Sequence, residues 1–231
     1  MQAEMQDKHV VVTGGGGALG GAIVESLIDA GATCHVPAFT ESDAASLALE
    51  GDRVRVTVGV DLTDEASTRA YFASLPPLWG SVHAAGGFAM AGITETSLEQ
   101  FEAMFRINAI TCFLSCREAI RSMRLAGGGR IVNVAARPAV APAGGLVAYT
   151  TAKAAVASMT QCLADEVHGD GILVNAVLPS MIDTPANRAA MPQADHRAWP
   201  TPAQIAEAIR FLVSPQNTLT WGALMPVYGR A

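Results

Sequence analysis

The chain is poor in charged residues and has no long stretch of one sign. Only 16% of its 231 residues are Asp, Glu, Lys or Arg, and the formal net charge is −6. A nucleic-acid-binding surface needs clustered Lys and Arg, so we expect no nucleic-acid partner. Since half of the residues are hydrophobic, the low charge content predicts apolar surface that is covered in a homodimer or homotetramer.

Long apolar runs are also missing. No uninterrupted apolar run reaches the roughly 18 residues that a membrane-spanning helix needs, so we expect no membrane partner. Residues 1–9 are polar and mixed in charge, unlike the basic and then apolar start of a secretory signal. The sequence therefore predicts a soluble cytoplasmic protein.

The usual metal-binding patterns are absent as well. Cys34, Cys112, Cys116 and Cys162 form no C-x-x-C pair, and the five histidines form no H-E-x-x-H motif. Cys112 and Cys116 would share one face of a helix, but this spacing suits neither an easy disulfide nor a zinc knuckle. We therefore expect buried reduced thiols and no catalytic metal.

Short apolar runs alternate with helical patterns along the chain. Such alternation predicts right-handed β-α-β units, and hence a single α/β domain over residues 1–231 with a doubly wound parallel sheet of about seven strands. The predicted strands are Val10–Val12, Thr33–Val36, Val54–Val58, Val82–Ala85, Arg130–Val134, Ile172–Val177 and Leu224–Val227. The predicted helices between them include Glu65–Ser74, Leu98–Met123, Ala148–Val167 and Pro202–Leu212.

A run of glycines follows the first predicted strand. Thr13 leads into Gly14–Gly17, and the helical pattern that follows ends at Gly31, a typical helix C-cap residue. A strand, a glycine turn and a helix N-terminus together form an anion site, because backbone N–H groups and the positive end of the helix dipole face one point. Glycine lets the backbone approach a pyrophosphate closely, so the pattern favours dinucleotide binding over a plain tight turn.

Tyr149 and Lys153 lie four residues apart in the predicted helix Ala148–Val167. This spacing places both side chains on one helix face, one turn apart. A cation near a phenol favours the phenolate, which lowers the tyrosine pKa and suits proton transfer near neutral pH. Taken alone, the spacing fits equally a surface tyrosine that packs on a lysine stem.

Together these motifs resemble the short-chain dehydrogenase/reductase family. Its Thr-Gly-x-x-x-Gly-x-Gly pattern matches Thr13, Gly14 and Gly20, with Ala18 at the middle glycine, and its Tyr-x-x-x-Lys matches Tyr149 and Lys153. Further matching segments are Asp61–Leu62, Ala84–Gly86, Asn108, Asn175–Ser180 and Val227–Gly229. The resemblance spans nearly the whole chain and implies a Rossmann-like, NAD(P)-dependent oxidoreductase.

The resemblance also implies roles for the matching residues. Tyr149 would be the general acid/base, Lys153 would hold the ribose hydroxyls of the cofactor and lower the Tyr149 pKa, and Asn108 would anchor a water that links Lys153 to solvent. The implied dinucleotide site comprises Thr13, Gly14, Gly17, Ala18, Leu19, Gly20, Asp61, Leu62, Ala85, Gly86, Tyr149, Lys153, Pro179, Ile182 and Thr184. The implied substrate pocket comprises Ala136, Arg137 and Met181, lined also by Phe88, Met90, Val140 and Val147.

One family residue is missing. The family carries a serine thirteen residues before the tyrosine, and that position here is Ala136. The serine hydroxyl donates to the substrate oxygen as negative charge develops, and losing such a donor can cost about 3 to 4 kcal/mol. Arg137 could replace it. Alternatively, the substrate could need no donor, like the quinonoid ring reduced by the family's dihydropteridine reductases, which also carry alanine.

Two readings without catalysis also stay open: a non-catalytic NAD(P)-binding sensor or subunit, and a structural oligomer with a vestigial glycine loop. The presence of Tyr149, Lys153 and Asn108 favours catalysis. The leading hypothesis is hydride transfer to or from a small or medium apolar carbonyl or alcohol, or a conjugated quinonoid-type compound.

Cofactor choice and a lid complete the expectations. Ala38 and Phe39 occupy the positions where NAD-preferring members carry Asp and many NADP-preferring members carry Arg. Thr40 and Ser42 could bind a 2′-phosphate, so the sequence leans slightly to NADP(H). Segment 183–202 contains Pro185, Pro192 and Pro200, ends at a fourth proline, Pro202, and has few apolar residues; it follows the nicotinamide-contacting segment that the resemblance implies. We expect it to form a substrate lid.

Overall fold

Seven parallel strands form one sheet in the computed structural model, which describes residues 4–49 and 51–230. Their order is β3-β2-β1-β4-β5-β6-β7, so the predicted doubly wound α/β fold is confirmed. The strands are β1 His9–Thr13, β2 Thr33–Ala38, β3 Val54–Val58, β4 Gly80–His83, β5 Gly129–Val134, β6 Ile172–Pro179 and β7 Leu224–Val227.

The middle of the sheet is covered on both faces. Every residue of β4, β5 and β6 is buried, including the polar Ser81, His83 and Asn133, and β6 has a nearly continuous apolar sequence. The edge strand β3 is exposed at four of its five residues. The register places Thr13, His83, Asn133 and Ala176 side by side near the carboxyl ends of their strands. This row is the base on which the candidate site is built.

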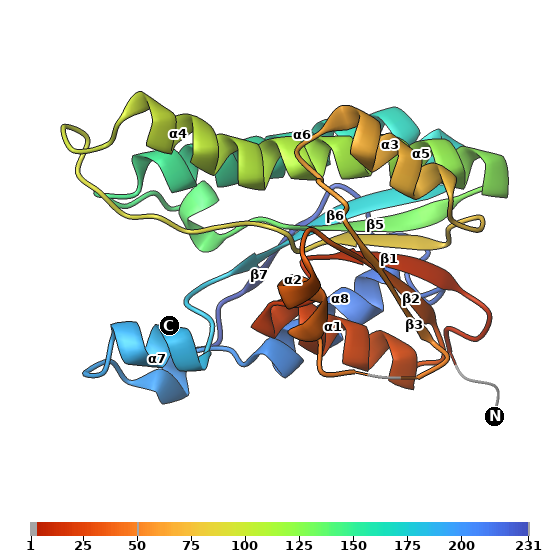
Figure 1. The fold of residues 1–231 in the computed structure, drawn as a ribbon, viewed down its shortest axis with the longest axis horizontal. Coiled ribbons are helices and arrows are strands. Elements are labelled where there is room, and N and C mark those ends of the chain that lie inside the picture. Colours follow the sequence, from red (N-terminus) through yellow and green to blue (C-terminus); the bar gives the residue numbers. More distant parts are fainter. Residues whose placement is uncertain (1–3, 50, 231) are drawn as a thin grey trace.

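Helices cover the sheet in two layers (Figure 1). On one face α1 packs against α8, and on the other lie α3, α4, α5 and α6. Helix α7 lies at the end of the molecule that also carries the C-terminus. The helices are α1 Ala18–Asp29, α2 Glu41–Ala45, α3 Glu65–Ala73, α4 Leu98–Phe105, α5 Thr111–Ala126, α6 Val147–Val167, α7 Pro185–Ala190 and α8 Pro202–Val213.

The apolar residues of these layers form two cores, one on each face of the sheet. On the first face Ile23 and Leu27 of α1 meet Ile209 and Leu212 of α8, and all four are fully buried. On the second face Met123 of α5 is buried against residues of α6 and β6. The 3.6-residue periodicity of α1 and α8 therefore reports a real buried stripe.

Most predicted elements have bounds within two residues of those in the structure, and two of the differences have an evident cause. The expected helix Leu98–Met123 is interrupted by a π-helical turn at Arg106–Ile110, where Asn108 Nδ2 donates to the Met104 carbonyl. The expected strand Val82–Ala85 begins earlier and ends at His83, because the Ala85 N–H donates to the Thr13 side chain instead of a neighbouring strand. Both differences arise from side-chain contacts with the backbone.

Helices α2 and α7 were not expected at all. Helix α2 begins with a capping box, in which the Thr40 hydroxyl accepts from the Asp43 N–H and the Asp43 carboxylate accepts from the Thr40 N–H. Helix α7 begins with Thr184 as N-cap and Pro185 in its first turn. Both helices are too short to show a hydrophobic period.

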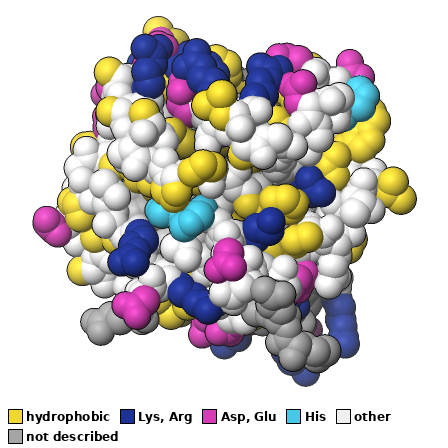
Figure 2. Space-filling model, turned by 90° about the vertical axis from the view of Figure 1, so that its right-hand side faces the viewer, with side chains coloured by type: hydrophobic (Ala, Val, Ile, Leu, Met, Phe, Trp, Pro, Cys, Tyr) yellow, Lys and Arg dark blue, Asp and Glu magenta, His cyan; other side chains and the backbone are white. Residues whose placement is uncertain are grey.

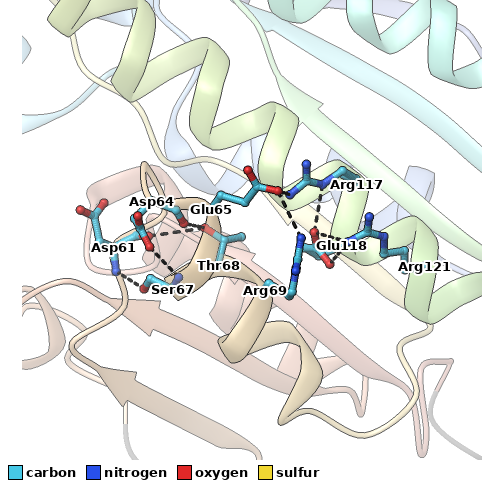
Figure 3. A network of polar contacts seen from close by, with 9 residues as sticks. All are labelled: Asp61, Asp64, Glu65, Ser67, Thr68, Arg69, Arg117, Glu118 and Arg121. Atoms are coloured by element: carbon cyan, nitrogen blue, oxygen red, sulfur yellow. Dashed lines mark hydrogen bonds and ion pairs between the residues drawn. The ribbon is translucent and has the colours of Figure 1, made fainter.

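Ion pairs join α3 to α5 across the second layer (Figure 3). Glu118 is 5% exposed, and its carboxylate accepts hydrogen bonds from Arg117 and Arg121. Arg117 also donates to Glu65 of α3 at 2.9 Å. The two arginines satisfy a carboxylate that burial would otherwise destabilise. The network fixes the helix that continues directly from the turn carrying Asn108.

Charges on the surface are mixed. On the face seen in Figure 2, Lys and Arg side chains are interspersed with Asp and Glu, without a large patch of one sign among the residues drawn in colour. Within the described part of the chain, no helix is long and apolar enough to cross a bilayer.

Candidate active site

The loops that follow β1 and β4 touch at the carboxyl edge of the sheet. Thr13 Oγ1 accepts a hydrogen bond of 3.1 Å from the Ala85 N–H. Gly14 has a φ of +70°, and a Cβ there would lie 2.7 Å from the Ala85 nitrogen. Ligands of open α/β sheets bind where the strand order reverses, and in this sheet the reversal falls between β1 and β4. The contact therefore lies at the expected crevice.

The glycine run is shaped by contacts within the protein. A Cβ on Gly20 would overlap the Gly14 carbonyl oxygen, whereas one on Gly17 would meet nothing closer than 3.4 Å. A Cβ on Gly15 would lie 2.6 Å from Val36 Cγ1, and one on Gly16 would lie 2.5 Å from the Asp43 carbonyl oxygen. Close packing within the protein, against backbone at Gly14, Gly16 and Gly20 and against a side chain at Gly15, thus explains four glycines that the sequence alone assigned to close approach of a pyrophosphate.

The N-terminus of α1 faces the same crevice. Gly17 is its N-cap, and no side chain caps the helix. The first N–H groups of a helix have no partner within it, so those of Ala18, Leu19 and Gly20 need an external acceptor. A pyrophosphate supplies that acceptor and a charge that complements the helix dipole. The predicted residues of this loop therefore fit a dinucleotide.

Asp61 and Leu62 follow β3. The Asp61 Oδ1 atom accepts from the Thr63 N–H and hydroxyl, both at 2.8 Å. Figure 3 shows the Asp61 carboxylate turned away from the polar residues of α3. Leu62 packs against the core of the second layer. Their contact with an adenine ring stays a prediction.

Lys153 and Asn108 meet at Gly86. Lys153 is 6% exposed, and its Nζ donates to the Val134 carbonyl at 2.8 Å. A Cβ on Gly86 would lie 2.5 Å from Asn108 Oδ1 and 3.3 Å from Lys153 Nζ. Three residues that are far apart in the sequence are therefore brought together, as the resemblance implies.

The amide of Asn108 is held by backbone groups. Its Oδ1 accepts from the Gly87 N–H at 3.2 Å, and its Nδ2 donates to the carbonyls of Gly87 and Met104. The side chain thus ties the π-helical turn to the segment after β4. A role in anchoring a water stays a prediction.

Tyr149 lies one turn before Lys153 on α6 and is half-buried, with its ring 5.0 Å from the Phe88 ring in an edge-to-face contact. Burial raises the pKa of Tyr149 to about 12 and lowers the pKa of Lys153 to about 8. The pKa of Tyr149 is therefore raised, whereas the spacing to Lys153 predicted a lowered pKa. In the chain alone, the Lys153 ammonium donates its hydrogen bond to the Val134 carbonyl, and removal of the Tyr149 phenol from water is the main influence on its pKa.

Ala136 and Arg137 follow β5. Ala136 is 5% exposed, so its methyl group occupies the place of the family's serine hydroxyl in a buried position. Arg137 is exposed, and its guanidinium carbon lies 5.0 Å from the centre of the Tyr228 ring. The Arg137 side chain, whose direction the sequence left open, therefore points toward the segment after β7.

The residues after β6 lead into the expected lid. Pro179 ends β6, and Met181 and Ile182 are half-buried. Thr184 caps α7 through the Asn187 N–H at 3.2 Å. The base of segment 183–202 is closed where the Asp183 N–H donates to the Pro200 carbonyl at 2.9 Å, and no residue from 183 to 199 is buried. Few buried contacts suit a mobile cover, and its movement stays a prediction.

The structure also assembles a group that the sequence did not indicate. His83, at the end of β4, lies beside Cys112 and Cys116 of α5, and all three are buried. The sequence showed only that the two cysteines share a helix face, because His83 precedes Cys116 by 33 residues. No metal was expected here.

The glycine contacts generate a prediction with a matched control. We expect Gly20→Ala to lower both the melting temperature and the affinity for NADH, because its Cβ overlaps the Gly14 carbonyl and must displace the loop. Gly17→Ala has room for its Cβ and should retain the parent melting temperature. Thermal unfolding and titration of NADH fluorescence measure both quantities. Parent-like behaviour of Gly20→Ala would contradict this account of the loop.

Comparisons with known proteins agree with this geometry. Residues 8–195 match the family model described as short chain dehydrogenase. The 2-(R)-hydroxypropyl-CoM dehydrogenase of Xanthobacter autotrophicus is 34% identical over 74% of this chain and 76% of its own length. The cis-4-hydroxycyclohexanecarboxylate dehydrogenase of Sinomonas cyclohexanicum is 31% identical over 96% of both chains.

A solved structure extends the similarity to three dimensions. The 3-ketoacyl-(acyl-carrier-protein) reductase of Brucella melitensis, complexed with NADH, superposes with a TM-score of 0.88. It is 26% identical, and the match covers 98% of this chain and 99% of the reductase. The chain therefore belongs to the short-chain dehydrogenase family and is an NAD(P)-dependent oxidoreductase.

Proposed function

We propose that the chain transfers hydride between a nicotinamide cofactor and a small or medium, apolar secondary alcohol or its ketone, with Tyr149 as the acid/base. The observation that carries this proposal is the meeting of Lys153 and Asn108 at Gly86, with Tyr149 one turn before Lys153 on α6 and the uncapped N-terminus of α1 beside them. The two relatives described above, whose names are those of dehydrogenases of hydroxy compounds, support the same class of substrate.

The preference for an apolar substrate rests on exposed side chains near Tyr149. Phe88 and Met90 are 60% and 68% exposed, and Phe88 contacts the Tyr149 ring. The Ala91 N–H donates to the Gly145 carbonyl, which holds this segment against the loop that precedes α6. An apolar substrate body would cover these side chains and gain about 25 cal/mol for each Å² removed from water.

The residues of the chain handle the proton, while the nicotinamide ring, when bound, supplies or accepts the hydride. In reduction, the Tyr149 hydroxyl donates its proton to the carbonyl oxygen; in oxidation, the phenolate removes it from the alcohol. A phenol with a pKa of about 12 is almost wholly protonated at neutral pH, so forming the phenolate that oxidation requires needs a nearby cation. Lys153, one turn away, is the residue that we assign to this task.

We expect Tyr149→Phe to lower turnover by about 10² to 10⁴-fold, because it removes the proton donor. NADH affinity should stay close to that of the parent, since the aromatic ring is retained. Tyr71→Phe is the matched control, because the Tyr71 hydroxyl is buried without a hydrogen-bond partner and lies in the opposite part of the second layer. Steady-state rates with cyclohexanol, cyclopentanol and 2-octanol provide the measurement. Unchanged turnover in Tyr149→Phe would remove Tyr149 from the mechanism.

We further propose that Arg137 does not replace the missing serine, since its guanidinium is stacked on Tyr228. The site then works with a substrate that needs no second donor. Conjugated quinonoid-type compounds are the second candidate class, because their charge spreads over the ring instead of one oxygen.

Two substitutions separate these accounts. Ala136→Ser should raise turnover of simple ketones, by up to the 10² to 10³-fold that one oxyanion donor can supply. Arg137→Ala should leave turnover nearly unchanged. A large loss in Arg137→Ala that Ala136→Ser partly restores would instead identify Arg137 as the donor. If neither variant nor the parent turns over any alcohol, ketone or quinonoid compound while NADH still binds, the non-catalytic sensor or subunit becomes the better function.

For the cofactor, the contacts of α2 favour NAD(H) over the NADP(H) to which the sequence leaned. The Thr40 hydroxyl, a candidate phosphate ligand, bonds to the Asp43 carboxylate at 2.8 Å. Gly16 of the dinucleotide loop packs on the Asp43 carbonyl, so this acidic helix borders the site. Exposed carboxylates at Glu41 and Asp43 would repel a 2′-phosphate.

Asp43→Asn tests this preference. Removing one exposed charge near the site should shift the ratio of NADH to NADPH affinities toward NADPH on the order of fivefold, since such a charge contributes about 1 kcal/mol in water. Asp165→Asn on α6 makes the same change in net charge on an exposed residue of another element. Fluorescence titrations of both cofactors give the ratio. An equal shift in the two variants, or none in Asp43→Asn, would contradict the assignment.

We also propose a homo-oligomer. Leu98, Ile107 and Phe113, on the segment from α4 to α5, are 73%, 36% and 45% exposed. Apolar side chains in such numbers along neighbouring turns are typical of a face covered by another subunit.

A further inference from the structure

We propose that His83, Cys112 and Cys116 bind a thiophilic metal ion, Zn²⁺ or Cu⁺, in a closed structural site beneath the catalytic residues. The Nδ1 or Nε2 atom of His83 and the two sulfurs all lie within 4.8 Å of one another. His83 and Cys112 are each 3% exposed and Cys116 is 1% exposed. This site is independent of the proposed substrate.

The arrangement of the polar atoms is close to that of a coordination shell. Asn133 Oδ1 lies 2.8 Å from His83 Nδ1, 3.3 Å from Cys112 Sγ and 3.4 Å from Cys116 Sγ. His83 Nδ1 lies 3.3 Å from Cys116 Sγ. Around a tetrahedral zinc ion with bonds of about 2.0 to 2.3 Å, neighbouring ligand atoms are about 3.3 to 3.8 Å apart. An expansion of a few tenths of an ångström would therefore admit the ion, with Asn133 Oδ1 as the fourth ligand.

Rigid elements hold these groups in place. His83 and Asn133 are paired residues of the adjacent strands β4 and β5, while Cys112 and Cys116 are one turn apart on α5. Around them, Ser81 Oγ lies 2.8 Å from His83 Nε2, and Asn133 Nδ2 donates to Thr160 Oγ1 at 2.8 Å. Such outer hydrogen bonds orient ligands in metal sites.

Proton and charge balance are consistent with a buried ion. Binding Zn²⁺ releases one proton from each thiol to solvent, and the two thiolates cancel the charge of the ion. In the hydrogen-bonded form, a proton on His83 Nδ1 points at Asn133; on binding, the ring carries its proton on Nε2, where Ser81 Oγ accepts it. Two sulfurs and one imidazole select a soft or borderline ion over Mg²⁺ or Ca²⁺.

The ion would brace the floor of the site. His83 is followed directly by the Ala84–Gly86 segment, and Asn133 is followed by Val134, whose carbonyl holds Lys153. One ion bound by residues of β4, β5 and α5 would therefore hold in place both the Ala84–Gly86 segment and Val134. Four protein ligands leave no open coordination position, so the ion would act in stability and not in catalysis.

Cobalt is the spectroscopic probe. Because the ligands are buried, the ion must enter as the chain folds, so the full chain is expressed in zinc-depleted medium supplemented with Co²⁺ and purified under reducing conditions. We expect one Co²⁺ per chain and the near-ultraviolet charge-transfer band of thiolate-bound cobalt. Cys116→Ser should lose the band, whereas Cys162→Ser, which alters an exposed cysteine, should retain it. Elemental analysis of protein from ordinary medium distinguishes zinc from copper.

His83→Asn controls for misfolding. Residues 83–86 align with the Asn-Asn-Ala-Gly motif of the short-chain dehydrogenase family, which carries asparagine at the position of His83. This variant should keep the parent circular dichroism spectrum and NADH affinity while losing the cobalt band. The proposal is overturned if the parent shows no thiolate–cobalt band, if the band survives in folded His83→Asn and Cys116→Ser, or if Cys162→Ser abolishes it. In those cases the group is a hydrogen-bond network only.

Discussion

The contact between Gly14 and the Ala85 backbone is the constraint on which both halves of the active site depend. It joins the loop after β1, which leads into the uncapped helix α1, to the segment after β4. One residue further, Gly86 lies against Asn108 and Lys153. The crevice and the predicted catalytic group are thus adjacent parts of one close-packed layer, in which a methyl group added at Gly14, Gly20 or Gly86 would clash with its neighbours.

Burial sets the chemistry of this layer. In the chain alone, it raises the pKa of Tyr149 to about 12 and lowers that of Lys153 to about 8, because burial disfavours the charged form of each group. Opposite shifts in neighbouring groups are typical of sites that exchange protons. The proposed role of Tyr149 as a proton acceptor therefore depends on how close the Lys153 ammonium comes to the phenol. The Val134 carbonyl, which accepts a hydrogen bond from Lys153, is part of that control.

The rim of the site differs from its floor. Phe88 and Met90 are exposed apolar groups, Ala136 offers a methyl group in place of a hydroxyl, and segment 183–199 has no buried residue. The floor is made of buried strands and a polar cluster around Asn133, all tied to backbone or side-chain partners. If segment 183–199 moves as the proposed lid, such a rigid floor would let substrate enter without displacing the residues that we propose to carry the reaction.

The sequence by itself determined the parallel α/β sheet, including the bounds of β3 and β7. It also predicted a site at Tyr149, Lys153 and the glycine loop, because these signals lie within a few neighbouring residues. Tertiary structure decided what depends on distant partners. The π-helical turn around Asn108 follows from contacts with Gly87, the reason for the glycines lies in Val36, Asp43 and Ala85, and the pKa direction of Tyr149 follows from burial. The meeting of His83 with two cysteines required the register of β4 against α5, which no local pattern encodes.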